Sequence, residues 1–517
     1  MEYEQHATPS FLGDERQRQS GLLLHVTSLP SPHGIGDLGP QARRWVDYLH
    51  DAQQRWWQIL PVSPIGPGNS PYEPLSTFAG NVLLISPDDL VAEGFLAASD
   101  IEHSPLPNEV VDFDAVLNLK LPLLQKSHET FLARKSSHWN DEFSSFCHEH
   151  AGWLDDYALF YALHDRMGTR TYLDWPDELV NRDQAAMDQW RCELAGEIDA
   201  CRFRQFLFFR QWRKLKEYAR AKDVQIIGDL PFFVSPNSSD VWAHPELFLL
   251  DERRRPIFRA GVPPDYFSEN GQLWGNPIYD WSAMENAGYR WWIERIRHLL
   301  LQVSLIRLDH FRAFAAAWHV PATAETAKDG EWREGPGAAL FHVLHQALGA
   351  LPFIAEDLGL ITKDVRELRD AFHFPGMRVL QFAFDGTAEN PFLPARYTVN
   401  SVAYTGTHDN NTTRGWYQNL DDAMRQVVWQ VLQHEELPES DVAHLFMEMM
   451  WQSRAALAIA PLQDLLNLGA EARMNVPGEA EGNWLWRCPP DIWESPHWQS
   501  LRQMTVDAGR AAPLLHD

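Results

Sequence analysis

The chain has 517 residues, 45% of them hydrophobic, and a formal net charge of −27 at pH 7. This negative charge argues against binding to nucleic acid or to an anionic membrane surface, because both repel an acidic protein. No stretch approaches about 18 uninterrupted apolar residues and no apolar signal segment opens the chain, so we expect a cytoplasmic protein without a membrane span. The four cysteines are scattered without a CxxC pair, which predicts free thiols.

The chain opens with the polar stretch 1–20, which we expect to form a loose arm. A short apolar run at 21–26 then reads as a strand, a Gly/Pro-rich loop follows, and residues 41–52 repeat apolar side chains at helical spacing. A second apolar run at 57–61 completes the order strand, loop, helix, strand. In one sheet this order implies two parallel strands joined by a right-handed crossover.

Two segments interrupt this pattern. Residues 66–220 begin as a Gly/Pro/Ser-rich loop and continue as amphipathic helical patterns without a convincing strand, which predicts a mostly helical insertion. Between 251 and 281, glycine and proline are too frequent for a regular element. Aromatic residues lie among them, so this segment is either a packed Ω-loop or an aromatic lid that faces a ligand. These aromatic residues are Tyr266, Phe267, Trp274, Tyr279 and Trp281.

Alternating helical and strand-like patterns return after residue 281. Helical patterns occupy 289–303, 338–348 and 365–371, and a further helical insertion is expected at about 421–470. Strand-like runs begin near residues 22, 57, 224, 304, 353, 377, 401 and 472. Eight alternating units predict an α/β fold, a (β/α)8 TIM barrel with inserted, mostly helical subdomains. The barrel would start in 21–65 and resume over 221–517.

Three of these runs end in ionisable residues: Asp309 follows 304–308, Glu356 follows 351–355, and Asp409 follows 401–407. Carboxylates at the carboxyl ends of parallel strands converge if the strands belong to one barrel. Arg307 lies two residues before Asp309, so in a strand both side chains point the same way and the guanidinium favours the ionised carboxylate. A structural Arg-Asp pair would explain one such strand end, but it does not explain three.

Carboxylates in this arrangement suit the cleavage of a sugar acetal with retention of configuration. That reaction needs a carboxylate nucleophile and a carboxylic acid about 5 to 5.5 Å apart. A metal site is the rival interpretation, because His310 and His408 adjoin Asp309 and Asp409. Strand alternation argues against each neighbouring pair chelating one ion, and HExxH, GxGxxG and GxxxxGK[ST] motifs are absent. We therefore expect neither a metal nor a cofactor.

The strand-end residues belong to a larger set of short motifs that occur in order from about Gly21 to Trp486. Taken together, the set resembles the 4-alpha-glucanotransferases (amylomaltase or disproportionating enzyme), relatives of the α-amylases. Each motif is weak alone, but the ordered set is highly specific. The motifs are HVTSLP (25–30), IGDLG (35–39), SPY (70–72), GDLP (228–231), GVPPDYFS (261–268), GQLWGNP (271–277), IRLDHFR (306–312), AEDLG (355–359), GTHDN (406–410) and RMN (473–475).

The resemblance implies a role for each candidate residue. Asp309 would be the nucleophile, Glu356 the general acid/base with a raised pKa, and Asp409 the carboxylate that stabilises the oxocarbenium-like state. Arg307 and His408 would hold the donor sugar, with Asp229 in support. The residues expected to contact the glucan chain are Tyr72, Tyr266, Phe267, Gln272 and Trp274.

The resemblance also implies the reaction and the fold. An α-1,4-glucan segment would pass from a donor malto-oligosaccharide or amylose to the 4-OH of an acceptor glucose, maltose or glucan, through a covalent glycosyl-enzyme. The fold would be a TIM barrel with inserted subdomains. The chain departs from the family pattern at four positions that bear on acceptor preference and loop contacts. Many members have Gly, Glu and Tyr at Ala313, Ala315 and Ala317, and Asp at Asn411.

Two other functions remain open at this stage. An α-1,4-glucan hydrolase would use the same carboxylates and would be distinguished by comparing glucose release with chain redistribution on maltotriose. A non-catalytic glucan-binding protein would keep the aromatic residues and lose a carboxylate. All three carboxylates are present, which argues against the second alternative.

Overall fold

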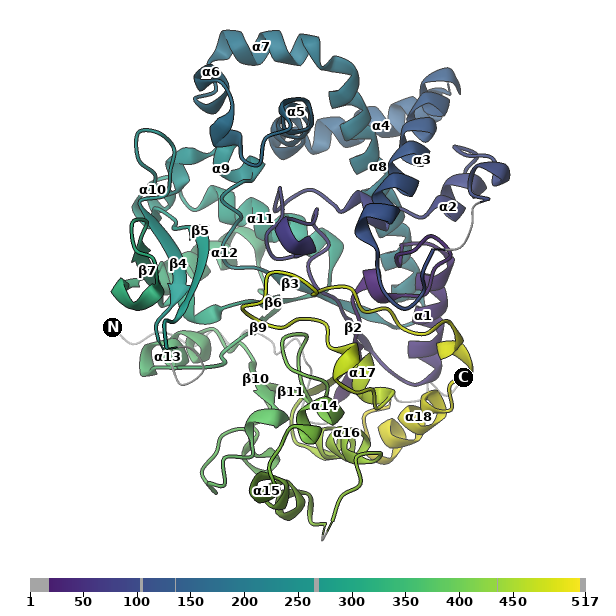
Figure 1. Ribbon diagram of the computed structural model, residues 1–517, viewed down its shortest axis with the longest axis vertical. Coiled ribbons are helices and arrows are strands. Elements are labelled where there is room, and N and C mark those ends of the chain that lie inside the picture. The colour runs from purple at the N-terminus through teal and green to yellow at the C-terminus, as the bar shows by residue number, and fades with distance from the viewer. Residues whose placement is uncertain (1–17, 103–105, 135, 265–268, 435, 512–517) are drawn as a thin grey trace.

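The computed structural model describes residues 18–102, 106–134, 136–264, 269–434 and 436–511. At its centre, parallel strands form a closed barrel in the order β1-β12-β11-β10-β9-β6-β3-β2 (Figure 1). The predicted (β/α)8 barrel is therefore confirmed. Its strands are β1 (Gln19–Leu23), β2 (Trp56–Gln58), β3 (Gln225–Leu230), β6 (Leu305–Leu308), β9 (Phe353–Ala355), β10 (Gly376–Val379), β11 (Ser401–Tyr404) and β12 (Leu457–Pro461).

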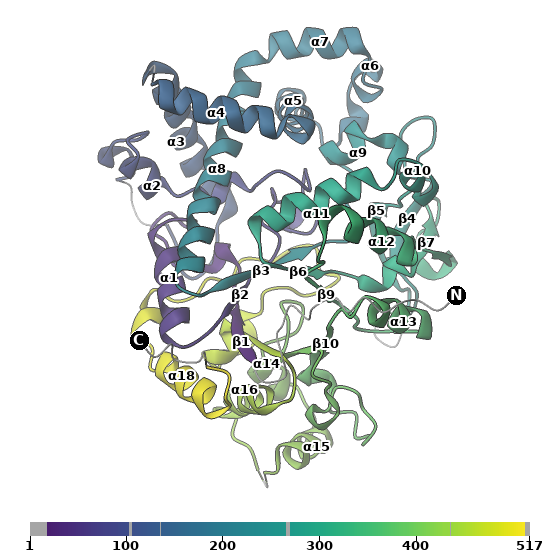
Figure 2. The same cartoon turned by 180° about the vertical axis from the view of Figure 1, so that it is seen from behind.

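Helices cover the outside of the barrel, and in the view from behind α1, α8 and α11 lie over β2, β3 and β6 (Figure 2). The strands are thus buried on both faces, which explains why they appear in the sequence as continuous apolar runs without alternation. The covering helices are α1 (Pro40–Asp51), α8 (Ala195–Ala221), α11 (Arg290–Gln302), α12 (Gly337–Leu348), α13 (Lys363–Ala371), α14 (Thr413–Gln418), α16 (Val442–Gln452) and α18 (His497–Asp507). Side chains that fill the barrel include Leu23, Trp56, Ile227, Leu305, Ile354, Met377, Val402, Tyr404 and Ile459.

The last strand of the barrel is not where the sequence pattern placed it. In the predicted run 472–478, residue 472 ends the short 3₁₀ turn Ala470–Ala472 and residues 473–478 continue as a loop, whereas β12 lies inside the segment 421–470 that we predicted to be helical. That segment does contain α15 (Asp422–Leu432), α16 and the short α17 (Leu462–Leu465). All five residues of β12 are buried. A short, fully apolar run of this kind cannot be distinguished from a buried helix by periodicity.

β12 pairs in parallel with β1, from Gln19 opposite Leu457 to Leu23 opposite Pro461. The barrel is therefore closed by two segments separated by most of the chain. Gln19 and Ser20, which we assigned to the arm 1–20, are the first residues of β1. The rest of that predicted arm, up to residue 17, lies outside the described residues.

Helices of the segment 66–220 lie above the barrel in Figure 1 and have a core of their own. That core includes Leu159, Phe160, Tyr172, Trp175 and Leu194. The last part of α8 instead packs against the barrel, with Trp212 and Leu215 in the main core. The other helices here are α2 (Pro87–Ala92), α3 (Phe113–Arg134), α4 (Ser137–Glu149), α5 (Ala151–Met167), α6 (Asp177–Val180) and α7 (Gln184–Glu193).

A second, antiparallel sheet with the order β5-β4-β7-β8 stands beside the barrel. Its strands are β4 (Phe258–Val262), β5 (Gln272–Pro277), β7 (Ala316–Pro321) and β8 (Glu331–Glu334), and α9 (Ser239–Ala243) and α10 (Trp281–Asn286) flank the first two in the chain. Our expectation that 251–281 contains no regular element was wrong. A Cβ atom on Gly261 would lie 2.4 Å from the carbonyl oxygen of Gln272, so glycine here permits close pairing of strands instead of preventing it.

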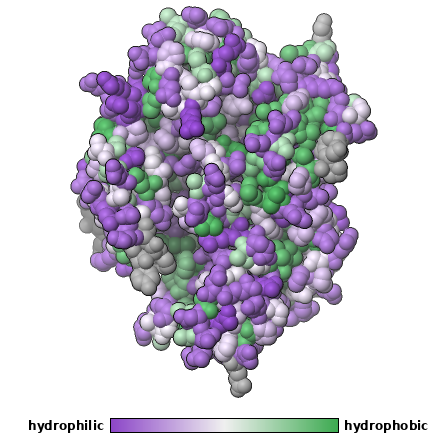
Figure 3. Space-filling model, viewed as in Figure 1, coloured by the Kyte–Doolittle hydropathy of each residue, from purple (hydrophilic) through white to green (hydrophobic). Residues whose placement is uncertain are grey.

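The surface agrees with the acidic composition. On the face seen in Figure 1 most side chains are hydrophilic, and apolar ones gather in patches, including part of a hollow near the centre (Figure 3). Among the described residues, no helix combines the length and the apolar character needed to cross a membrane.

Candidate active site

Arg307 organises the residues at the ends of β3 and β6. Its Nη1 lies 2.9 Å from Asp309 Oδ1, and it donates to both carboxylate oxygens of Asp229, at 2.8 and 2.7 Å. Asp229 pairs with Arg307 in the parallel register of β3 and β6, which places the two side chains side by side. The expected common orientation of Arg307 and Asp309 is therefore present. One buried guanidinium thus contacts both carboxylates. Burial raises the pKa of Asp229, and the charge of Arg307 lowers it in part.

Glu356, just after β9, is fixed by backbone donors on both of its carboxylate oxygens. The amide of His310 donates to Oε2 at 2.9 Å, and the amide of Leu358 donates to Oε1 at 3.0 Å. His310 adopts a left-handed backbone conformation with φ of 49°, an uncommon conformation for a residue other than glycine. Burial raises the pKa of Glu356 to about 8; the nearby Arg307 lowers it in part, and the charge of Asp309 raises it further. This agrees with the raised pKa expected of the acid.

Asp409 receives hydrogen bonds from a loop that follows the barrel's last strand. Asn475 Nδ2 donates to Asp409 Oδ1 at 2.7 Å, and Arg473 Nη2 donates to the Asp409 carbonyl at 2.6 Å. His408 Nε2 lies 3.3 Å from the same carboxylate oxygen. In the sequence, Arg473 and Asn475 stand out only as part of a motif, and no contact with Asp409 was predicted for them. Their position in that motif was the only sequence signal.

Tyr72 lies against His408 and beside Asp229. The two rings are stacked, with centroids 5.2 Å apart and planes inclined by 13°, and the Tyr72 hydroxyl donates to Asp229 Oδ2 at 2.8 Å. Burial strongly raises the pKa of Tyr72, so its hydroxyl stays a donor at neutral pH. The Trp484 ring lies 5.7 Å from Tyr72 and 6.1 Å from His408, and these contacts were not predicted from the sequence. These rings form one aromatic cluster beside the carboxylates.

β5 contributes the other predicted contact residues. Trp274 Nε1 donates to Gln272 Oε1 at 3.1 Å, and the Trp274 ring meets the His310 ring nearly at a right angle, with centroids 4.9 Å apart. Trp274 thus lies next to the residue that follows Asp309. Tyr266 and Phe267 lie outside the described residues.

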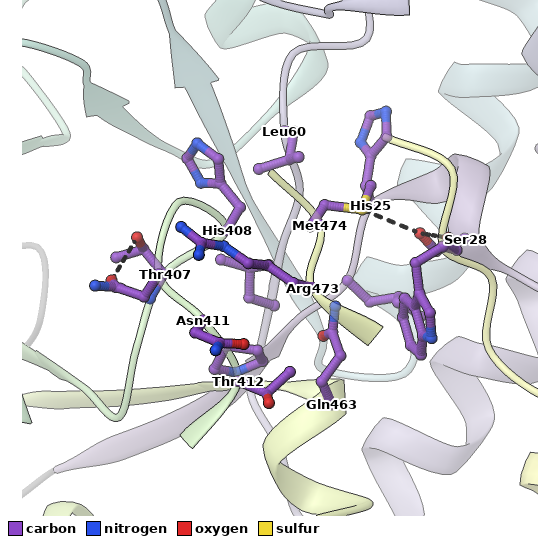
Figure 4. Close-up of a pocket in the computed structure, with 15 residues that line it drawn as sticks. His25, Ser28, Leu60, Thr407, His408, Asn411, Thr412, Gln463, Arg473 and Met474 are labelled. Carbon is purple, nitrogen blue, oxygen red and sulfur yellow. Dashed lines mark hydrogen bonds between the residues drawn. The ribbon is translucent and has the colours of Figure 1, made fainter. Parts of the chain in front are cut away.

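A small cavity of about 20 Å³ lies beneath His408 and the Asp409 loop (Figure 4). In its wall, Ser28 Oγ donates to the sulfur of Met474 at 3.9 Å, and the hydroxyl of Thr407 donates to Asn410 Oδ1 at 2.9 Å. The cavity has room for water but not for a sugar. Burial and the neighbouring His408 lower the pKa of His25, another wall residue, to about 3, so its imidazole is neutral. We refer to this space, which borders the site at His408, as the floor cavity.

The four departures from the family pattern occupy different places. Asn411 lines the floor cavity, and its carbonyl accepts a hydrogen bond from Gln381 Nε2 at 2.9 Å. Ala313 and Ala317 are buried, whereas Ala315 is partly exposed. Of the four positions, Asn411 therefore borders a cavity next to His408, and Ala315 is the only one of the three alanines that is partly exposed.

The three carboxylates thus experience three different environments. Asp309 accepts from a buried guanidinium, Glu356 is buried and has a raised pKa, and Asp409 accepts from an amide. Carboxyl groups whose environments separate their protonation states can serve as acid and nucleophile at the same pH. The arrangement can therefore protonate a leaving oxygen and attack an acetal carbon together.

Comparison with known proteins agrees with this chemistry. A family profile described as 4-alpha-glucanotransferase matches residues 24–492. The chain is 44% identical over 498 residues to the 4-alpha-glucanotransferase of Thermus thermophilus, covering 95% of this chain and 98% of the relative. It is 45% identical over 495 residues to that of Synechocystis, covering 94% and 98%.

Solved structures show the same relationship. The amylomaltase from Streptococcus agalactiae in complex with acarbose superposes with a TM-score of 0.93 at 37% identity, covering 96% of this chain and all of that one. The amylomaltase from Corynebacterium glutamicum has a TM-score of 0.79 at 19% identity, covering 94% of this chain and 75% of that one, and shows the fold alone. With a profile match over most of its length and relatives that align along nearly all of it, this chain belongs to the 4-alpha-glucanotransferase family and is a glycosyl-transferring enzyme.

Proposed function

We propose that this enzyme disproportionates α-1,4-glucans. It takes a glucan segment from a donor malto-oligosaccharide or amylose and transfers it to the 4-OH of an acceptor glucose, maltose or longer glucan. The observation that carries the proposal is the pairing of a buried Glu356, whose pKa is raised to about 8, with an Asp309 held by Arg307. The relative from Streptococcus agalactiae, solved with acarbose, supports an oligosaccharide ligand.

The first half of the reaction cleaves the donor. An Asp309 oxygen attacks the anomeric carbon while the Glu356 proton passes to the glycosidic oxygen, so the bond to the leaving chain breaks as the bond to Asp309 forms. The product is a covalent glycosyl-enzyme, with Glu356 now ionised. The two backbone amides on Glu356 hold its carboxyl group in one orientation through this change of charge.

The second half returns both carboxylates to their starting states. The ionised Glu356 takes the proton of the acceptor 4-OH, whose oxygen attacks the anomeric carbon and displaces Asp309. Two inversions give net retention. The pKa of Glu356 favours this step, because a group with a pKa near the working pH serves as acid in one half and as base in the other.

The remaining residues would bind and orient the donor sugar. Asp409, held by Asn475, would accept hydrogen bonds from sugar hydroxyls that strengthen in the oxocarbenium-like state. Arg307 and His408 would contact the same sugar, with Asp229 fixing Arg307. Glucan units would stack on the rings at this site, whose apolar faces match those of a sugar. We assign these contacts to Tyr72, Gln272 and Trp274, and to Tyr266 and Phe267 of the segment 251–281.

Chain redistribution on maltotriose tests the proposal. A transferase converts maltotriose into glucose and a ladder of longer chains while the number of reducing ends stays constant. A hydrolase, the alternative with the same carboxylates, raises the number of reducing ends and accumulates glucose and maltose. Steadily rising reducing ends without longer chains would overturn the proposal. The transfer reaction belongs to the metabolism of maltose, glycogen or starch, which we propose as the role of this protein in the cytoplasm.

A further inference from the structure

A buried arginine outside the carboxylate cluster joins two segments that carry residues of the donor site. Arg295 lies on α11, and only 2% of its surface is exposed. Its Nε donates to the Thr77 hydroxyl at 2.8 Å and its Nη2 to the carbonyl of Pro231 at 2.6 Å. Its Nη1 donates to the Phe232 carbonyl at 3.1 Å and to the Tyr279 hydroxyl at 3.2 Å. The guanidinium thus bridges the segments around residues 77 and 231.

Each of these segments leads directly to the site. Thr77 lies five residues after Tyr72, and Pro231 lies two residues after Asp229. At their near ends the same segments meet through the hydrogen bond of 2.8 Å between the Tyr72 hydroxyl and Asp229. Tyr72 therefore connects the segments at the site and Arg295 connects them behind it, in addition to the hydrogen bonds that Leu75 and Thr77 make with Ser239 and Asp240.

The two segments do not fill all of the space between the hydrogen bonds of Tyr72 and Arg295. A cavity of about 30 Å³ lies there, lined by Pro74 and Thr77 on one side, by Asp229 and Pro231 on the other, and by Arg295. A space of this size holds about one or two water molecules and separates the side chains that border it. The hydrogen bonds of Tyr72 and Arg295 on either side of this cavity thus contribute to the distance between Tyr72 and Asp229.

The acceptors of Arg295 indicate that the residue serves geometry more than charge neutralisation. Each is a neutral hydroxyl or carbonyl oxygen, and the planar guanidinium directs its donors in fixed directions. The rings of Trp291 and Trp292 lie 5.2 and 5.0 Å from it. Asp240 completes the arrangement by accepting from the Thr77 amide at 2.8 Å, so Thr77 is held through both its amide and its hydroxyl.

We infer that Arg295 is a positioning residue for the donor sugar: it holds the Tyr72 segment against the Asp229 segment, and through them it orients Arg307 and Asp309. The inference rests on the proposed function, because it assigns a purpose within that site. A lysine at this position keeps the charge but cannot reproduce the three-directional donor pattern. The backbone bond from the Ser239 amide to the Leu75 carbonyl, at 2.8 Å, remains in such a variant, so the segment loosens without detaching.

A double-mutant cycle on maltotriose disproportionation tests the inference. Arg295→Lys should lower kcat/KM by about 10- to 100-fold, as expected when reacting groups are displaced by a fraction of an ångström to 1 Å. The Tyr72→Phe background already lacks the hydrogen bond to Asp229. In it, the same substitution should lower kcat/KM by less than about threefold. The apparent KM for glucose as acceptor should stay within about twofold of the wild-type value, because the donor side alone is disturbed.

Two controls separate positioning from general destabilisation. Arg297→Lys changes an exposed arginine on the same helix and should leave kcat/KM within about twofold. A second cycle pairs Arg295→Lys with Trp274→Phe. Trp274 lies on β5, outside the two segments that Arg295 bridges, so the effects of the two substitutions on kcat/KM should multiply. Melting temperatures of every variant, measured alongside, show whether each is folded at the assay temperature.

Each possible outcome either supports or contradicts the role of Arg295 as a positioning residue. If the effects of Arg295→Lys and Tyr72→Phe multiply within about twofold, Arg295 does not act through Tyr72 and the inference is wrong, while wild-type chain redistribution still supports the proposed function. If Arg295→Lys does not fold, Thr77→Val decides by the same cycle, because it removes only the hydroxyl acceptor. If the wild type does not redistribute maltotriose, the proposed function fails first and the inference fails with it.

Discussion

The substitution Glu356→Gln should inactivate the enzyme and stabilise it, and the stabilisation should depend on pH. Burial raises the pKa of Glu356 from 4.5 to about 8, which means that the folded protein disfavours the ionised carboxylate. That difference in pKa corresponds to a free energy on the order of 5 kcal/mol. Glutamine has nearly the same shape and cannot ionise, so it escapes this cost.

The sign of the effect follows from proton binding. Between pH 4.5 and about 8 the folded wild type keeps a proton on Glu356 that the unfolded chain has released. Its free energy of unfolding therefore falls as pH rises through that window and levels off above it. Glu356→Gln has no ionisable group at this position. Its free energy of unfolding relative to that of the wild type should therefore rise by on the order of 5 kcal/mol between pH 4.5 and about 8.

One pH-independent cost accompanies the change. The amides of His310 and Leu358 each donate to a carboxylate oxygen of Glu356, and the amide nitrogen of glutamine cannot accept either bond. An unsatisfied backbone donor costs about 1 to 3 kcal/mol at every pH. The pH dependence of the stability difference, not its absolute size, therefore reports the pKa of Glu356.

Thermal unfolding midpoints of wild type and variant at intervals from pH 5 to 9 measure this difference. It should grow with pH and become constant above about pH 8. Glu367→Gln, which removes an exposed carboxylate from α13, is the matched control and should show a difference that does not change over this range. A flat curve for Glu356→Gln would refute the reasoning, because Glu356 would then ionise as freely in the folded protein as in the unfolded chain.

The same pKa predicts the kinetics. Wild-type kcat/KM should fall above about pH 8 as the acid loses its proton, and Glu356→Gln should lack this alkaline limb. A donor with an activated leaving group needs no protonation, so with it the first step of the variant should partly recover. If such a donor rescues nothing in a burst measurement, the acid role belongs to another residue.

Three further predictions concern other residues that the sequence or the structure assigns to the candidate site. Asp309→Asn should remove turnover by several orders of magnitude in a protein with wild-type circular dichroism, and activity within about tenfold of wild type would contradict its role as nucleophile. Asn475→Ala removes the amide that donates to Asp409 and should lower kcat/KM by about 10- to 100-fold, with Arg473 left in place; an effect below about twofold would show that the bond does not matter. Replacing Tyr266 and Phe267 together by alanine should raise the fraction of maltotriose turnovers that end in free reducing sugar, and an unchanged fraction in a folded, active variant would exclude a lid.

The sequence predicted those parts of the fold in which local pattern and tertiary environment agree. Barrel strands that end in Asp309, Glu356 or Asp409 are apolar runs that stop at ionisable residues, and both features follow from a strand buried on two faces whose carboxyl end opens on the site. Strand β12 was missed because its short apolar run lies among helical patterns, from which periodicity does not distinguish it. The strands β4 and β5 were missed because their glycines were interpreted as breaking structure, although Gly261 permits their pairing.

The sequence pattern did not predict the contacts between residues that are far apart in the chain. Asn475 reaches Asp409 across 66 positions of the chain, and Tyr72 reaches Asp229 across 157. Neither pair has a periodicity that a single sequence reveals. The same holds for Arg295, which in sequence is one more polar residue on an amphipathic helix and in the structure bridges two segments of the site.

The pairing of β1 with β12 has a consequence for how the protein is made. Ribosomes deliver the chain from its N-terminal end, so β1 emerges early and has no partner on one edge until Leu457–Pro461 has been synthesised. The helices around the core of 157–201 can pack long before that point, because their contacts are local. The nascent chain should therefore carry a folded cap above an open, protease-sensitive sheet, and ribosome-bound chains halted before and after residue 461 should differ sharply in cleavage near β1. For most of its synthesis the protein is an unfinished barrel whose exposed strand edge must be kept from other chains.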